Sequence, residues 1–333
     1  MIARGKIAAG LAVMVGALAV TAALPLFGTV DISLSELFGG ALSDSQRTIF
    51  FDVRLPRVAL GFLAGGALAV AGLVFQSLLR NPLATPFTLG VASGASLGSA
   101  LYIHAGVSWA VLGLSGGTWF AFGGALGASG LVFAVARAVG RRDNVTLLLS
   151  GVAVTFFFSS LILFAQYIAD FTAVFKMIRW VMGGLSVVGF DQVWSLAPFA
   201  LAAAALAIWK SPELNLIATG DDLAHSRGVN VSRVRTGFFI FLSLATGAAV
   251  ALVGPIGFVG MMVPHMLRLV FGSDNRVLAP VTFVVGGAFL ALCDALARTI
   301  LSPAELPVGI ITALLGGPFF LWLLVKTRGA VRL

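Results

Sequence analysis

Long apolar stretches alternate with short polar segments along the chain. A helix that crosses the hydrocarbon core of a bilayer needs about 20 predominantly apolar residues. Most of the stretches reach that length, and 256–270 is short enough to be a partial or tilted crossing. The stretches are 7–27, 56–79, 86–103, 118–137, 145–168, 192–209, 236–254, 256–270, 277–300 and 307–325. The pattern predicts an all-α integral membrane protein with about ten transmembrane helices.

The composition agrees with burial in lipid. Of the 333 residues, 59% are hydrophobic and 10% are charged, whereas about a quarter of a soluble domain is charged. The first stretch, 7–27, exceeds the ~7–15 apolar residues of a signal peptide and lacks a clear A-x-A cleavage site. We therefore interpret it as the first membrane helix and expect residues 1–333 to form one transmembrane domain.

The net charge of +8 is a topology signal rather than a sign of nucleic-acid binding, because the basic residues lie mostly in short loops. An even number of crossings places both termini on one side of the membrane. Of the Lys and Arg residues, 15 fall on that side and 6 on the other. The positive-inside rule then places both termini in the cytoplasm, together with the longest connection on their side, Ser211–Arg235.

The opposite side carries two amphipathic segments and a basic pair. The segments are 31–52 and 170–191, and the second contains Lys176, Arg179 and Trp180, as expected at a membrane interface. Arg54 and Arg57 flank the proline that begins the next helix, so their side chains are neighbours. Two interpretations of this pair stay open: interfacial snorkelling, or a docking site for an acidic partner.

One carboxylate lies deep in an apolar stretch. Asp294 is costly to bury unless it is paired or functional, and Arg298 lies one helical turn away on the same face. A structural ion pair is the favoured interpretation. A secondary, ion-coupled transporter would have to rely on Asp294 alone, which makes that class the weaker alternative.

Catalytic and metal-binding patterns are missing from the sequence. The three histidines are far apart, the single cysteine Cys293 lies in an apolar run, and no clustered nucleophile and base mark an intramembrane enzyme. We expect no catalytic residue, no metal site and no cofactor in this chain. No G-x-x-x-x-G-K-S/T loop is present, so ATP-driven transport would require a separate ATPase chain.

Small residues recur four apart in several stretches and predict close helix crossings. These are Gly61, Gly65 and Ala69, Gly94 and Gly98, and Gly123 and Gly127. The segment Ser211–Arg235 is polar and amphipathic, with Thr219 or Asp221 able to cap a short helix and Gly228 able to end it. We interpret this segment as a contact surface for a cytoplasmic partner.

Several motifs in a fixed order now point to one family. They are Arg54-Leu55-Pro56-Arg57, Gln76 with Asn81-Pro82-Leu83-Ala84-x-Pro86, Leu89-Gly90 with Gly94-Ala95, Leu149-Ser150-Gly151-Val152-Ala153, Trp180-Val181-Met182-Gly183-Gly184-Leu185, Gly257-Phe258-Val259-Gly260-Met261-Met262-Val263-Pro264-His265-x-x-Arg268, and Glu305-Leu306-Pro307-Val308-Gly309. The chain resembles the FecCD-type permeases of type II ABC importers, which take up iron–siderophores, haem and vitamin B12. The resemblance covers nearly the whole chain.

The resemblance implies a ten-helix permease subunit of the bacterial inner membrane that forms a homodimer. It further implies two ATPase subunits, which hold ATP and Mg²⁺, and a periplasmic or lipid-anchored binding protein on the other side. Arg54, Arg57 and Arg298 match family arginines that meet acidic residues of that binding protein. This moves the interpretation of the Arg54 and Arg57 pair toward docking.

The resemblance also assigns the inner gate, the pathway and the ATPase contact. Asn81, Leu83, Asn144 and Val145 match gate positions, and 145–168 matches a pathway-lining helix on which Phe164 and Tyr167 form a bulky wall. The segment 216–229, within a coupling region of about 211–235, matches the cytoplasmic coupling helices. Its candidate coupling residues are Leu216, Ala218, Gly220, Asp221, Asp222, Ala224 and Gly228. A ferric siderophore is the first choice of substrate, with haem and cobalamin as alternatives.

Overall fold

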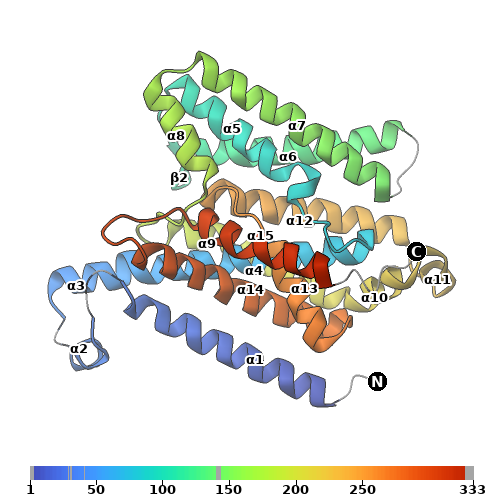
Figure 1. Cartoon of the computed structure of the whole chain (residues 1–333), viewed down its shortest axis with the longest axis horizontal. Helices are drawn as coiled ribbons and strands as arrows, with labels where there is room; N and C mark the ends of the chain where they lie inside the picture. The colour runs from blue at the N-terminus through green and yellow to red at the C-terminus, as the bar shows by residue number, and fades with distance from the viewer. Residues whose placement is uncertain (1–3, 29, 31, 41, 140–143, 327–333) are drawn as a thin grey trace.

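Helix α4 (Leu55–Leu79) runs through the middle of the structure, and at least five other α-helices pack against it (Figure 1). The computed structural model describes residues 4–28, 30, 32–40, 42–139 and 144–326. Nearly all of α4 is buried, which explains why its sequence is apolar on every side. The helices that contact it are α9, α10, α12, α13 and α14.

Each predicted apolar stretch coincides with a helix. The helices are α1 (Arg4–Ala23), α4, α5 (Val91–Ala105), α6 (Gly116–Ala138), α7 (Asn144–Ile168), α9 (Asp191–Trp209), α12 (Val231–Val253), α13 (Val259–Phe271), α14 (Asn275–Thr299) and α15 (Val308–Lys326). Among the described residues, seven helices are long and apolar enough to cross a membrane, and α13 and Val308–Leu323 are shorter apolar helices. The 13 residues of α13 rise only about 20 Å, less than the hydrocarbon core of a bilayer, and its partial or tilted crossing stays a prediction. The all-α prediction is confirmed.

Short elements connect these helices. They are the 3₁₀-helices η1 (Leu24–Leu26) and η3 (Phe87–Leu89), the π-helix η2 (Ile49–Arg54), the α-helices α2 (Leu34–Gly39), α3 (Asp44–Thr48), α8 (Phe171–Val181), α10 (Ser211–Thr219) and α11 (Asp221–Ser226), and the antiparallel strands β1 (Ala110–Val111) and β2 (Leu114–Ser115). The predicted cytoplasmic segment thus contains two short helices, α10 and α11, that meet at Gly220.

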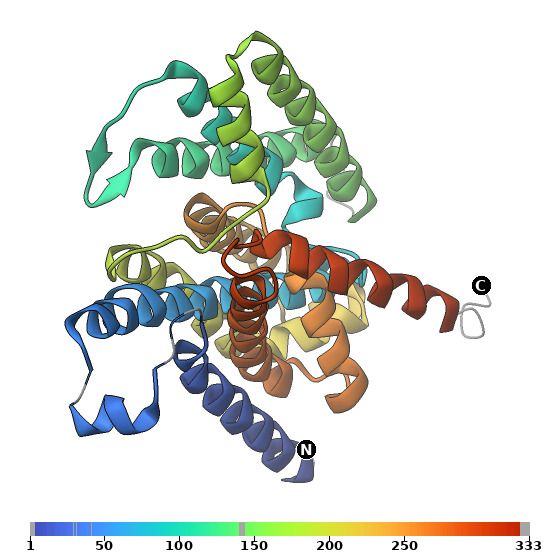
Figure 2. The same ribbon diagram turned by 60° about the vertical axis from the view of Figure 1, so that its left-hand side comes forward.

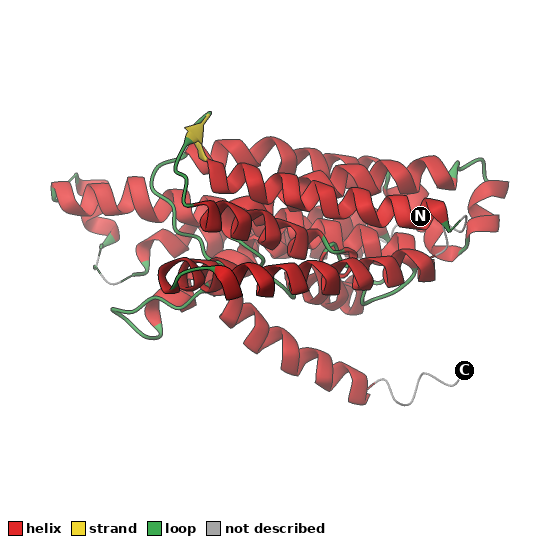
Figure 3. Ribbon diagram, turned by 90° about the horizontal axis from the view of Figure 1, so that it is seen from above, coloured by secondary structure: helices red, strands yellow, loops and turns green. Residues whose placement is uncertain are grey.

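The helices form two groups. Helices α5, α6, α7 and α8 lie together on one side of the bundle and contact the rest mainly through α12, whereas α1 lies on the opposite side against α14 (Figures 1 and 2). Most of the long helices follow a common direction, and α15 diverges toward its C-terminal end (Figure 3). The bundle therefore has two ends. The α10 end holds α10, α11, the start of α1 and the finish of α15, and the α8 end holds α2, α3, α8 and the connection 300–307 (Figure 1).

Glycines allow the closest helix crossings, as the four-residue spacing predicts. A Cβ added to Gly65 would lie 2.3 Å from the carbonyl oxygen of Gly286, where α4 crosses α14. A Cβ on Gly94 would lie 2.3 Å from the carbonyl oxygen of Gly124, where α5 crosses α6. The prediction for Gly123 and Gly127 is wrong, because a Cβ on either would meet nothing within 4 Å. The contact falls on Gly124, about 100° further around the helix.

Candidate functional site

A buried ion-pair cluster lies near the α8 end. Asp294 on α14 is 1% exposed and accepts two hydrogen bonds from Arg57 on α4, at 2.9 Å from Nε to Oδ2 and 3.0 Å from Nη2 to Oδ1. The predicted pair with Arg298 is present, with 3.2 Å between Arg298 Nε and Asp294 Oδ2. The sequence spacing indicated Arg298 but not Arg57, which reaches Asp294 only because α4 packs on α14.

Glu305 completes the cluster. Arg57 Nη1 donates to Glu305 Oε2 over 2.9 Å, and this carboxylate is half exposed while the arginine is 9% exposed at its side chain. Two arginines therefore face two carboxylates, and the cluster carries no net charge. The interpretation of Asp294 as a structural ion-pair residue is supported, because the two arginines hold its charge in place.

Arg54 has a different environment. Its guanidinium donates to the carbonyl oxygens of Pro25 and Leu26 at 3.3 Å and of Val30 at 2.6 Å. A Cβ added to Gly28 would lie 2.5 Å from Arg54 Nη2, so a larger residue here would require this guanidinium to shift. Arg54 thereby satisfies backbone carbonyls where α1 and η1 end. Arg54, Arg57 and Arg298 are all buried in this chain, and their docking role stays a prediction.

At the α10 end, Asp221 links three helices. As the first residue of α11, it lies 3.3 Å from Arg80 Nη2 at the end of α4 and 3.2 Å from Arg235 Nη2 on α12. Arg235 Nη2 also lies 3.5 Å from the carbonyl oxygen of Leu78. Helix α11, the predicted coupling helix, is therefore attached to the last turn of α4 by the ion pair with Arg80 and, through Arg235, by hydrogen bonds to Asp221 and Leu78.

The other predicted coupling residues divide into exposed and buried positions. Ala218, Asp222 and Gly228 are exposed, together with Leu223, which the sequence did not single out. Leu216 and Gly220 are partly exposed, whereas Ala224 is fully buried and anchors α11 to the bundle. The exposed positions are accessible to another protein, and their coupling role stays a prediction.

A second connection fixes α10 to the start of α14. Asn215 donates to Asp274 Oδ1 over 2.7 Å and accepts from the backbone N–H of Asn275 over 2.8 Å. Asp274 caps α14, and the hydrogen bonds from Arg276 and Asn215 lower the pKa of its carboxyl group to about 2. The hydroxyl of Ser77 on α4 lies 3.2 Å from Asn275 Oδ1, so the network reaches α4 as well.

The predicted gate residues lie directly beside these connections. Asn81 follows Arg80, and its side-chain oxygen accepts the backbone N–H of Leu83 over 2.9 Å, which fixes the turn. Leu83 is 47% exposed. On the other side of the turn, Gln76 donates to the carbonyl oxygens of Gly260 and Met261 at 3.3 Å and accepts from Arg268.

The remaining gate and pathway candidates all lie on α7, and no contact of their side chains with this turn is seen among the described residues. Asn144 and Val145 begin α7, and their side chains lie outside the described residues. Phe164 and Tyr167, on the same helix, are 61% and 87% exposed. Their aromatic faces are open to lipid or to a second chain, and their pathway role stays a prediction.

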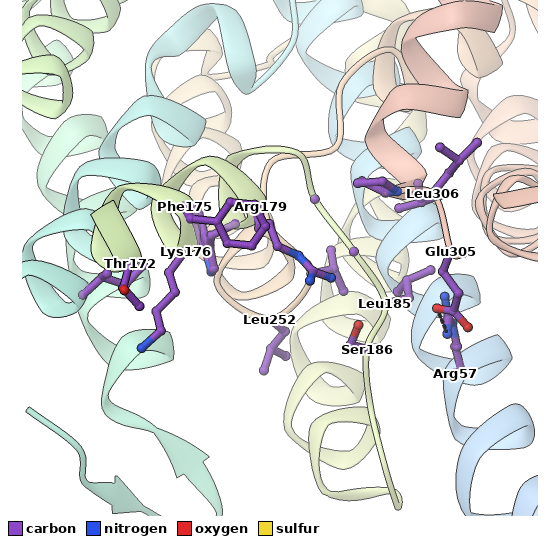
Figure 4. Close-up of a pocket in the computed structure, with 18 residues that line it drawn as sticks. Arg57, Thr172, Phe175, Lys176, Arg179, Leu185, Ser186, Leu252, Glu305 and Leu306 are labelled. Atoms are coloured by element: carbon purple, nitrogen blue, oxygen red, sulfur yellow. Dashed lines mark hydrogen bonds and ion pairs between the residues drawn. The ribbon is translucent and has the colours of Figure 1, made fainter. Parts of the chain in front are cut away.

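Two cavities lie between the helix groups. The first, of about 670 Å³, opens at the α8 end and is lined by Arg57, Lys176, Arg179, Trp180 and Glu305 among others (Figure 4). The second, of about 660 Å³, is mainly apolar, with Ser93 and Ser96 among its lining residues. Sequence reasoning missed the first cavity, because Lys176 and Arg179 were assigned only to the membrane interface. Within the described ranges, no group of three His, Cys, Asp or Glu side chains is placed to hold a metal ion.

Comparisons with known proteins agree with this geometry. The FecCD transport family matches residues 13–326. Similar proteins include the hemin transport permease HmuU of Yersinia pestis (37% identity, 90% of each chain), the cobalamin import permease BtuC of Halobacterium salinarum (40%, covering 84% of this chain and 74% of that protein) and the Fe(3+) dicitrate transport permease FecC of Escherichia coli (35%, 84% and 83%).

A solved structure has the same fold. It is described as an inward-facing conformation of a metal-chelate type ABC transporter, and it aligns with a TM-score of 0.83 at 28% identity over 94% of this chain and 98% of that chain. The family match extends over almost all the described helices. The chain therefore belongs to the FecCD transport family, the ABC-importer permeases that its motifs resemble.

Proposed function

We propose that this chain is the transmembrane permease subunit of an ATP-driven importer that carries an iron chelate, with a ferric siderophore as the first choice of substrate. Similar permeases are named for iron compounds, such as hemin and Fe(3+) dicitrate, and equally many are named for cobalamin or vitamin B12. Haem and cobalamin are therefore the alternative substrates.

The main observation that supports this proposal is the attachment of α11 to the end of α4. Asp221 forms an ion pair with Arg80, and Asn81, which follows Arg80 in the chain, begins the predicted inner gate. A partner that displaces α10 and α11 pulls on this turn directly. Such a connection suits alternating access, in which ATP binding on one side exchanges the inner and outer gates.

The proposed assembly is a homodimer with two ATPase subunits, which hold ATP and Mg²⁺, and a substrate-binding protein. The excess of Lys and Arg assigns the α10 end to the cytoplasm, where the ATPases bind, and the α8 end to the outer side of the bacterial inner membrane. Both termini then lie in the cytoplasm. The exposed aromatic face of α7 is left for the second subunit or for lipid.

An ion-coupled mechanism is the weaker alternative. A coupling carboxylate must gain and lose its proton or ion during each cycle, whereas Asp294 lies between Arg57 and Arg298. This pairing favours a structural role.

The proposal is tested by uptake in cells that lack this chain. Iron-starved deletion cells, with and without the restored gene, receive radio-iron as ferric siderophores, labelled haemin, and labelled cobalamin. Loss and rescue of siderophore-iron uptake supports the first choice. Loss and rescue of only haemin or cobalamin uptake assigns the alternative, and unchanged uptake of all three contradicts the proposal.

A further inference from the structure

The cavity at the α8 end is lined by more cationic than anionic side chains. Its lining includes the cations Arg57, Lys176 and Arg179 and one carboxylate, Glu305, so these side chains together carry a charge of +2. Glu305 is already paired with Arg57. Among the described residues, no ion pair or hydrogen bond is formed by the side chains of Lys176 and Arg179, and both are exposed.

The two unpaired cations share one face of α8. They are three residues apart, and Arg179 extends from the helix toward the segment 184–186 across the cavity (Figure 4). Phe175 and Trp180 lie on the same helix and line the same space. The cavity thus offers an aromatic wall, an ammonium group and a guanidinium group, a set that binds a carboxylate attached to a large apolar or chelating body.

This cavity lies next to the apolar cavity of about 660 Å³, and one segment of wall separates the two. Chain neighbours line the two spaces: Gly183 and Met182, Gly254 and Pro255, Val308 and Gly309. Backbone atoms are in close contact between the two spaces, since Gly184 N–H donates to the carbonyl oxygen of Val253 over 2.8 Å and a Cβ on Gly309 would lie 2.1 Å from the carbonyl oxygen of Met182. A ligand in the charged cavity therefore lies directly next to the apolar cavity.

We infer that the Lys176 and Arg179 cavity is a seat for the carboxylate groups of an anionic metal chelate on its way into the permease. This inference rests on the proposed import function and specifies its substrate class. A concave space of about 670 Å³ has the size of a small-molecule site, which favours a chelate over the flat surface of a protein partner. A neutral chelate gains nothing from the two cations.

The first test compares chelates of different charge in the complete importer, reconstituted with its ATPase and binding protein. The probes are ferric citrate and haemin, which carry carboxylates, and cyanocobalamin, which has amides at its periphery. In a variant with both Lys176→Gln and Arg179→Gln, uptake of the carboxylate probe should fall about tenfold in kcat/KM, the effect of losing two exposed ion pairs. Arg47→Gln, which changes an exposed arginine outside the cavity, should leave uptake unchanged.

Other outcomes overturn the inference in distinct ways. Unchanged uptake of the carboxylate probe by the double variant removes the seat. A parallel loss of affinity for the binding protein shows that the cations hold an acidic protein instead. If the unaltered importer carries only cyanocobalamin, the proposed import function is supported, but the inferred binding site for anionic chelates is contradicted. If it carries none of these probes and no ferric siderophore, the proposed function itself fails.

A second measurement detects the seat without transport. The only native cysteine, Cys293, is buried, so a Ser186→Cys variant places one reactive thiol in the cavity lining. Ferric citrate should slow maleimide labelling of this thiol several-fold, and the double variant should abolish that protection. Ser45→Cys, exposed on α3, should label equally with and without ferric citrate. Absence of protection at residue 186 overturns the inference.

Discussion

The carboxylate of Asp221 lies 3.3 Å from the guanidinium of Arg80, across the junction between α11 and α4. The same carboxylate lies 3.2 Å from Arg235 on α12. A single residue of the predicted coupling helix is therefore paired with one arginine at the end of α4, beside the gate turn, and with another on α12. The side chain of Asp221 is 35% exposed, so its ion pairs contribute little to the stability of the fold. An effect of Asp221 on coupling can therefore be measured without a large loss of stability.

Replacing Asp221 with Asn should uncouple ATP hydrolysis from transport. The amide keeps the size of the side chain and loses the charge that holds Arg80 and Arg235, so uptake should fall several-fold while ATPase activity persists. The loss of unfolding free energy should stay below about 1 kcal/mol. The matched control is Asp44→Asn, at an exposed position outside the coupling segment. Equal uptake by both variants would argue against a coupling role for Asp221.

Asp294→Asn should destabilise the fold rather than remove an ion-coupling step. The change leaves two buried arginines without their shared carboxylate, and breaking such a pair costs about 3–5 kcal/mol. Thermal unfolding of the purified protein should show a large loss, whereas Asp52→Asn, at an exposed position, should show little. Normal stability combined with abolished uptake would contradict this account and support ion coupling.

Glu305→Gln should tighten association with the binding protein, if Arg57 docks an acidic partner as the resemblance implies. Arg57 Nη1 forms an ion pair with Glu305 Oε2 over 2.9 Å. Removal of the Glu305 charge therefore makes this Arg57 donor available to a carboxylate of another protein. The affinity should rise several-fold at low salt and less at high salt, because the new contact is electrostatic. Unchanged affinity at both salt concentrations removes Arg57 from the docking surface.

Gly65→Val should disrupt the crossing of α4 and α14. A Cβ at this position would already lie 2.3 Å from the backbone of Gly286, so the helices must separate, at a cost of about 1–3 kcal/mol or more. Gly123→Val is the matched control, because a Cβ there meets nothing within 4 Å. The comparison is made by thermal unfolding in detergent, and equal melting temperatures would contradict the crossing.

The stability of the α10–α14 contact should depend on pH only in acid. The carboxyl group of Asp274 has its pKa lowered from 3.8 to about 2 in the folded chain, mainly by Arg276. Its contribution is therefore complete above pH 3.8 and is lost as the pH falls through 2. The acid-induced loss of stability over this interval should be smaller in Asp274→Asn than in the unaltered protein, and identical pH profiles would contradict the assignment.

The sequence predicts the helices better than their contacts. Apolar stretches long enough for a bilayer identify α4 and α14, because lipid imposes length and composition on each helix independently. The spacing of Asp294 and Arg298 also predicts their pair, since both lie on one helix. The bond from Arg57 to Asp294 spans 237 residues and depends on how two helices pack, which one-dimensional spacing does not encode.

The same limit explains the misassigned glycines and the missed cavity. Gly123 and Gly127 have the spacing of a close crossing, yet the contact falls on Gly124, because the rotation of α6 about its axis is fixed by its neighbours. Lys176 and Arg179 are typical of an amphipathic interfacial helix by sequence. Their position over a cavity follows only from the placement of α8 beside α5 and the segment 305–308.

Uptake into proteoliposomes tests the central claim most directly. Vesicles that contain this chain with its ATPase enclose ATP and Mg²⁺, and the binding protein with a radio-iron siderophore is added outside. The account predicts accumulation of iron that requires enclosed ATP and is insensitive to an imposed proton or sodium gradient. Accumulation driven by a gradient in the absence of ATP would contradict it.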